Sequence, residues 1–158
     1  MKIGRWMWTF SLAALLGAPA LFAAAPSGAS VVEGEWLRAM KANDLEAIVA
    51  CYAPDAILWA PGRAEARGTN AIREAYRGYL TESVVKDVSL AHVDHRDAAG
   101  FSAGWGEFTL TLAPKAGGDP IVMRGRFTEV VEKLGGKWLY VADHASADPA
   151  PAPAPASK

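Results

Sequence analysis

The stretch NDLEAIVACYAPDAILWAPG, residues 43–62, contains the start and stop signals that decide the fold. Its Asn-Asp pair at 43–44 supplies a turn and a helix N-cap, and apolar residues then recur at helical spacing, namely Leu45, Ile48, Val49 and Tyr52. The Pro-Asp pair at 54–55 ends this helix, and the Pro-Gly pair at 61–62 turns the chain again. The residues between these pairs, 56–60, predict a short apolar strand.

Helices are also expected on both sides of this stretch. Before it, apolar residues recur at helical spacing, namely Val32, Trp36, Leu37 and Met40. After it, Thr69 or Asn70 is expected to cap another helix, whose apolar side carries Ile72, Tyr76 and Leu80. The sequence therefore predicts three helices in its first half.

From residue 84 onward the apolar period changes to two, which is typical of strands. Four strands are expected, over 84–97, 101–112, 121–134 and 137–145, with glycine- or proline-containing turns between them. A chain in which the helices come first and a long strand meander comes last is predicted to form an α+β domain. We expect three N-terminal helices packed against a cone-shaped, bent antiparallel sheet.

The two ends of the chain differ in composition from the predicted domain at 30–147. Lys2 and Arg5 precede an apolar run that closes in three alanines at 23–25, the order of a secretory signal. Residues 1–25 are therefore expected to be a signal peptide, cleaved between residues 25 and 29, which makes the protein periplasmic or secreted. An uncleaved anchor is the alternative, since a membrane helix needs about 20 apolar residues. The Ala-Pro tail at 148–158 predicts disorder or a spacer.

Composition excludes several classes of protein. The 158 residues suit one domain, and 16 Lys and Arg against 17 Asp and Glu give a net charge of −1, so no nucleic-acid partner is expected.

The single cysteine, Cys51, cannot form an internal disulfide and is interpreted as a small buried residue. His92 and His95 lie three apart on one strand and face opposite sides. No metal and no cofactor are expected, and no membrane partner after signal cleavage.

Two groups of residues carry a resemblance to a known family. The first is the segment 43–56 with Pro61, Gly68 and 71–73; the second is 136–138 followed by Val141, Asp143, His144 and Ser146. Over residues 31–146 they resemble the nuclear-transport-factor-2-like superfamily, and especially its SnoaL-like branch, with ketosteroid isomerases and calmodulin-dependent-kinase association domains as relatives. The resemblance implies a cystatin-like cone of six strands with an apolar pocket. It also implies a homodimer formed through the outer face of the sheet.

The chain departs from the ketosteroid isomerases at two positions. Ala60 precedes Pro61 where those enzymes carry a catalytic aspartate, and Trp36 stands where they carry an oxyanion-binding tyrosine. Alanine has no proton to exchange, and an indole N–H donates from a different place than a phenol. Steroid isomerisation by that route is not expected.

Strand alternation selects three candidate catalytic acids. On 121–134 the apolar face includes Glu129, on 101–112 Glu107 shares a face with Trp105, and on the last strand Asp143 alternates with His144. If all three open into one apolar cavity, repulsion and desolvation raise at least one pKa, which gives a proton donor or acceptor near neutral pH. The alternative is that these acids are solvated, or paired with Arg124 or Arg126.

Aromatic residues provide the candidate ligand-binding set, which comprises Trp36, Tyr52, Trp59, Tyr76, Trp105 and Phe127. Core packing is the alternative for each of them, and Tyr76 is favoured because the resemblance matches it to a pocket tyrosine. The leading prediction is an exported SnoaL-like protein that binds a small apolar molecule in the cone. The alternatives are a cofactor-independent isomerase or hydrolase-like enzyme that uses the three acids, and a non-catalytic dimerisation module whose cavity is filled.

Overall fold

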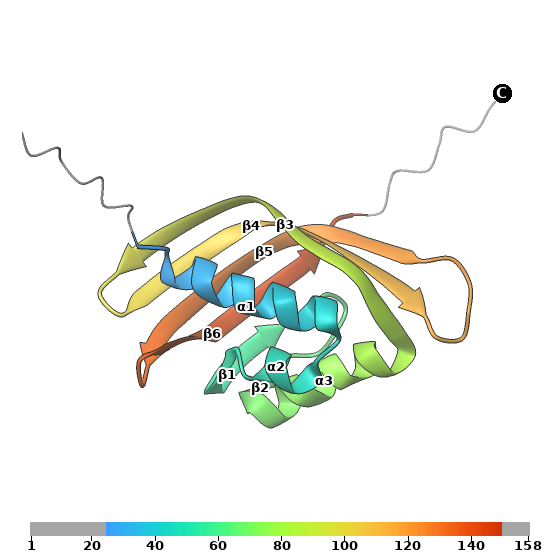
Figure 1. The fold of residues 1–158 in the computed structure, drawn as a ribbon, viewed down its shortest axis with the longest axis horizontal. Helices are drawn as coiled ribbons and strands as arrows, with labels where there is room; N and C mark the ends of the chain where they lie inside the picture. The colour runs from blue at the N-terminus through green and yellow to red at the C-terminus, as the bar shows by residue number, and fades with distance from the viewer. Residues whose placement is uncertain (1–24, 150–158) are drawn as a thin grey trace, which may run out of the picture.

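The computed structural model describes residues 25–149. Nearly all of the expected signal peptide and Ala-Pro tail, residues 1–24 and 150–158, lies outside the described residues. Figure 1 shows the described elements in chain order, which are α1 (Gly28–Ala42), α2 (Leu45–Val49), β1 (Tyr52–Trp59), β2 (Ala66–Arg67), α3 (Gly68–Glu82), β3 (Ser83–Ala98), β4 (Phe101–Pro114), β5 (Ile121–Leu134) and β6 (Lys137–Ala147). Within residues 25–149, no helix is long and apolar enough to cross a membrane.

The six strands form one curved sheet in the order β2-β1-β6-β5-β4-β3. The meander from β3 to β6 is antiparallel, as expected, but β1 and β6 run parallel, so a wholly antiparallel sheet is wrong at this pair. The reason is α3, which carries the chain from β2 at one edge to β3 at the other, so that the meander returns beside β1. The two-residue β2 is too short to have been recognised from its sequence.

The helices cover the concave side of this sheet. Figure 1 shows α1 lying across the curved strands, with α2 and α3 gathered near β1 and β2. Helix α1 contacts β3, β4, β5 and β6, whereas α3 contacts β1, β2 and β3. Each layer contributes fully buried side chains, including Val32 from α1, Ile48 from α2, Ile72 from α3, and Val88 and Val131 from the sheet. The predicted α+β cone is confirmed.

Asn43 and Asp44 act as the sequence predicts. Asn43 ends α1 in the left-handed conformation (φ 55°), and its side-chain amide bonds to the backbone N–H and C=O of Val85 at 2.7 and 3.1 Å. The Asp44 side chain caps α2 by accepting the N–H of Ala47 at 3.0 Å. These two residues fix α1, α2 and β3 relative to one another.

Two predicted helix boundaries are wrong. Helix α2 ends at Val49, and Tyr52 begins β1, so this tyrosine is held by the sheet and not by a helix. Helix α3 begins at Gly68, where φ is +78°, so Thr69 and Asn70 lie inside the first turn and do not cap it. The positive φ at residue 68 strongly favours glycine, which explains why the chain turns into the helix there.

Candidate functional site

An open cavity lies between the helices and the concave side of the sheet. It contains about 820 Å³ of space free of protein atoms, its open mouth included. Most of its wall is apolar, including Met40, Leu58, Leu90, Phe108, Leu110 and Met123. A few polar side chains also line it, chiefly Trp36, Tyr76, Glu129, Tyr140 and Asp143. An apolar cavity with a few convergent polar groups is typical of small-molecule sites.

A chain of hydrogen bonds leads from α1 to Asp143. The Trp36 Nε1–H group donates to Tyr76 Oη at 2.9 Å. The hydroxyls of Tyr76 and Tyr52 lie 2.7 Å apart, and Tyr52 donates to Asp143 Oδ2 at 2.6 Å. Because an indole can only donate and a carboxylate can only accept, each hydroxyl in this chain donates toward Asp143. Three elements, α1, α3 and β1, therefore orient a carboxyl that stands on β6.

Asp143 titrates close to neutral pH. Burial raises the pKa of Asp143 from 3.8 to about 6, while the hydrogen bond from Tyr52 and the charge of His144 act in the opposite direction. Among residues 25–149, Tyr52 is the one hydrogen-bond donor to this carboxyl. A carboxyl with this pKa, facing an apolar cavity, can accept or release a proton at physiological pH.

Glu129 lies directly across from Asp143 in the register of β5 and β6. It is 5% exposed, and its Oε1 atom has no hydrogen-bond partner among the described residues. Burial above all, and then the charges of Asp143 and Glu33, raise the pKa of Glu129 to about 10. Glu129 therefore carries a proton at neutral pH, in contrast to its neighbour.

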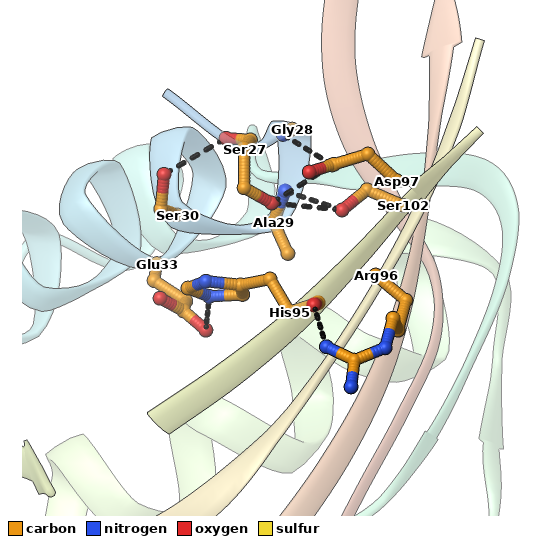
Figure 2. Close-up of polar contacts among 9 residues, drawn as sticks. All are labelled: Ser27, Gly28, Ala29, Ser30, Glu33, His95, Arg96, Asp97 and Ser102. Atoms are coloured by element: carbon orange, nitrogen blue, oxygen red, sulfur yellow. Dashed lines mark hydrogen bonds and ion pairs between the residues drawn. The ribbon is translucent and has the colours of Figure 1, made fainter. Parts of the chain in front are cut away.

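The structure adds a second buried glutamate that sequence analysis missed. Glu33 on α1 is 6% exposed, and its Oε1 lies 2.9 Å from Nε2 of His95 on β3, as Figure 2 shows. The two glutamates meet over Gly104 on β4, because a Cβ atom there would lie 3.1 Å from Oε1 of both Glu33 and Glu129. Glu33 stands three residues before Trp36, on the same helical face, and this spacing is the signal that could have identified it.

The structure brings most of the predicted site residues together. Trp36, Tyr76, Phe127, Glu129 and Asp143 line the cavity, and Tyr52 is buried behind them. The predicted inward direction of the apolar face of β5 is confirmed by the burial of Phe127, Glu129 and Val131. The role of each residue in binding or catalysis stays a prediction.

The predicted inward face of β4 is wrong. Glu107 lies on the outer face with its side chain 57% exposed, 3.0 Å from Nδ1 of His92. Trp105 shares that face, and the Arg96 guanidinium lies 5.6 Å from the centre of its ring. The opposite set of residues, which includes Phe108, faces the cavity.

Trp59 also lies away from the cavity, in contrast to its predicted role. It is 38% exposed, its ring stands edge-on to His144 at 6.3 Å, and its indole N–H donates to Glu65 at 3.1 Å. Leu58, the preceding residue, takes the inward position on β1.

A bulge in β6 changes which of its residues face inward. Val130 pairs with Ala142, whereas the next residue, Val131, pairs with Tyr140. The extra residue on β6 allows both Tyr140 and Asp143 to line the cavity, although they are three positions apart. Strict alternation places Asp143 correctly but puts Tyr140 on the wrong face.

The two histidines of β3 have separate partners. His92 contacts Glu107 on the outer face, whereas His95 contacts Glu33 beneath α1. Over residues 25–149, no group of three or more histidine, cysteine or acidic side chains is arranged to hold a metal ion.

Comparisons with known proteins identify the family. The model of the SnoaL-like domain matches residues 34–141. A crystal structure from Xanthomonas campestris, assigned as a calcium/calmodulin-dependent protein kinase II association domain, is 25% identical with a TM-score of 0.69, over 77% of this chain and 86% of that one. A ketosteroid isomerase-like protein from Erwinia carotovora is 21% identical with a TM-score of 0.66, over 75% and 92% of the two chains.

A third similar structure, from Novosphingobium aromaticivorans and assigned as a scytalone dehydratase, has a TM-score of 0.70 at 11% identity, over 77% of this chain and 82% of that one. No curated protein matches the sequence significantly. The family model covers more than half of the chain, and these structures share its cone. The chain therefore belongs to the SnoaL-like domain family and carries the pocket-bearing α+β fold of that family.

Proposed function

We propose that this domain binds a small, largely apolar molecule in the cavity, with one polar group of the ligand directed at Asp143 and Glu129. The observation that carries the proposal is an apolar cavity with an open mouth, in which these two carboxyls lie side by side on β5 and β6. A non-catalytic dimerisation module would need a cavity filled by its own side chains, whereas this one is open. The apolar wall would supply affinity, and the carboxyls would orient the ligand.

Binding can be tested with the fluorescent probe anilinonaphthalene sulfonate, which brightens in apolar surroundings. Leu110→Trp fills the cavity from β4, whereas Thr109→Trp places the same indole on the opposite face of that strand. We expect the wild type and Thr109→Trp to bind the probe and Leu110→Trp to lose binding. Equal binding by both variants, or no binding by the wild type, would contradict the proposal.

A second candidate function, favoured by one specific observation, is a cofactor-independent enzyme of the isomerase or hydrolase type. The pKa of Asp143 is about 6 and that of Glu129 about 10, so at neutral pH a base and an acid face the same ligand space. Two carboxyls whose environments separate their pKa values are a recurrent arrangement in acid–base catalysis. In this role Asp143 removes a proton from the ligand, and Glu129 donates one to an acceptor oxygen.

Proton abstraction can be tested without knowing the natural substrate. Cyclohexanone and aryl ketones are incubated with the protein in D₂O, and exchange of the protons next to the carbonyl is followed by NMR. We expect the wild type to accelerate exchange, Asp143→Asn to abolish the acceleration, and Glu107→Gln, on the outer face, to retain it. A wild type that exchanges no ketone faster than buffer would remove the enzymatic candidate and leave the binding proposal in place.

Export and homodimerisation complete the proposal. Export rests on the signal-like residues 1–25, and pairing through the outer face of the sheet rests on the family resemblance. N-terminal sequencing of the protein from the periplasm or medium tests the first, and light scattering tests the second. Retention of Lys2 and Arg5 in the mature protein, or a monomer mass in solution, would contradict the respective part.

A further inference from the structure

Three ionisable side chains form a cluster that begins at the cavity wall and extends behind it, and the proposed function does not use this cluster in full. Glu129 reaches the cluster from β5, Glu33 from α1 and His95 from β3. The glutamates are 5% and 6% exposed, and their Oε1 atoms both lie 3.1 Å from the position that a Cβ atom of Gly104 would occupy. Buried carboxyls are rare unless they are paired or neutral, so this arrangement requires an explanation.

The number of protons in the cluster follows from its contacts. Two carboxyls this close in a buried site cannot both be ionised, because their repulsion is not screened by water. Glu33 has a nitrogen partner, His95 Nε2 at 2.9 Å, whereas Glu129 Oε1 has no partner among the described residues. The carboxyl with the nitrogen partner keeps the negative charge, and Glu129, whose Oε1 atom lacks any partner within residues 25–149, takes the proton.

We propose that Glu33 and His95 are positioning residues that keep Glu129 a neutral carboxylic acid, so that Asp143 is the only ionised carboxylate among residues 25–149 that faces the ligand. The proton assignment stands on the cluster alone; only its consequence for the ligand rests on the proposed function. With one carboxylate and one carboxylic acid in the cavity, the site fits an uncharged ligand with an acceptor oxygen, such as a carbonyl compound, better than a cation.

The start of α1 is anchored so that Glu33 is held in place. Figure 2 shows Ser27 and Gly28 at Asp97 of β3, and Ser27 again with the hydroxyl of Ser102 on β4. The distances are 2.9 Å from Ser27 Oγ to Asp97 Oδ1, 3.3 Å from the Gly28 N–H group, and 2.9 Å between the two serine hydroxyls. These bonds lie less than two turns before Glu33, so the helix presents this carboxyl to the sheet in a fixed position.

The charged groups around Glu129 act in a consistent direction. Glu33 from α1 and Asp143 from β6 both raise its pKa by repulsion, while contact with the Tyr140 hydroxyl on β6 lowers it. On β4 the residue at this point is Gly104, which has no side chain. His95 on β3 faces Glu33, and Asp97 on the same strand also lies close enough to interact with that imidazole.

The variant Glu33→Gln separates charge from structure. Its amide oxygen can still accept the hydrogen bond from His95, but its negative charge is gone. With ¹³C-carboxyl-labelled glutamate, and Glu129→Gln to identify the resonance, NMR follows the Glu129 titration. We expect its midpoint to fall by at least one pH unit in Glu33→Gln, which is about tenfold weaker proton binding. Glu46→Gln, at an exposed carboxyl on α2, is the matched control and should leave the midpoint unchanged.

A Glu129 midpoint that stays the same in folded Glu33→Gln would overturn the proposal. A second measurement does not depend on the folding of that variant. The glutamine side chain in Glu129→Gln imitates a neutral acid, so the imidazole titration of His95, followed by NMR between about pH 5 and 8, should be the same in wild type and in this variant. A downward shift in the variant would show that Glu129 is ionised in the wild type, and would refute the assignment. Neither measurement uses a ligand, so both titrations can still be interpreted if the binding proposal fails.

Discussion

Replacing Glu129 by glutamine should stabilise the fold at neutral pH but not at acidic pH. The pKa of Glu129 rises from 4.5 in the unfolded chain to about 10 in the folded protein. Between these values the folded protein holds a proton that the unfolded chain releases, so wild-type stability falls as the pH rises. At 1.36 kcal/mol per pH unit, the difference between pH 7 and the unfolded-state pKa lowers the free energy of unfolding of the wild type by about 3 kcal/mol. Glutamine occupies the same space without this cost.

The assay is urea unfolding followed by tryptophan fluorescence at several pH values between about 4.5 and 8. We expect the folding equilibrium constant of Glu129→Gln, divided by that of the wild type, to increase about tenfold with each pH unit. This ratio should be smallest at the acidic end. Titration of Asp143 affects both proteins and largely cancels in the comparison. Glu82→Gln, at an exposed position near the end of α3, controls for the loss of one carboxyl. A stability difference that stays constant over this range, or shrinks as the pH rises, would refute the reasoning.

Three further predictions concern single contacts. Tyr52→Phe removes the hydroxyl that donates to Asp143, so the pKa of Asp143 should rise above about 6 by NMR titration; an unchanged value would mean that the hydrogen bond is not formed. Gly104→Ala places a methyl group 3.1 Å from both buried glutamates and should destabilise the fold by about 1–3 kcal/mol in urea, whereas wild-type stability would contradict this packing. Asn43→Ala loses both hydrogen bonds to Val85 and the left-handed preference of asparagine, and should cost about 1–3 kcal/mol in the same assay; a smaller loss would argue against this tie.

The order of elements could be predicted because its signals are local. Asn43 and Asp44 form the predicted turn and cap, and the apolar alternation along β5 places Phe127 and Glu129 on the inner face. Both depend on residues close in sequence. The parallel pairing of β1 with β6 depends on where a distant strand returns, which no local pattern encodes.

Glycine is the reason that the face of β4 was misassigned. In the first half of β4, Gly104 and Gly106 make the inner face less hydrophobic than the outer face, which carries Trp105. A Cβ at Gly106 would lie 2.9 Å from the carbonyl oxygen of Ala91 and 3.0 Å from the Phe127 ring. These positions are glycine because neighbouring groups occupy the space, so glycine on a strand face here indicates crowding and not exposure.

The other site residues that could not be predicted from the sequence are ones whose positions depend on tertiary structure. Tyr140 faces the cavity because β6 gains a residue relative to β5, and a bulge cannot be located from alternation alone. Apolar periodicity does not indicate that Glu33 is buried, because its partner in the buried site is His95, which is 62 positions away in the sequence.

The one-way hydrogen-bond chain from Trp36 to Asp143 has a consequence for any reaction in the cone. If Asp143 takes a proton from a ligand, its new O–H group can donate to Tyr52, which then donates to Tyr76. The indole of Trp36 still donates to Tyr76, so both approaches to that phenol oxygen are filled and its own hydrogen must turn elsewhere. Tyr76 borders the ligand space, and an oxyanion forming there would find a newly released donor. Capture of a proton at Asp143 would in this way release a donor at Tyr76 that could hold the negative charge left behind.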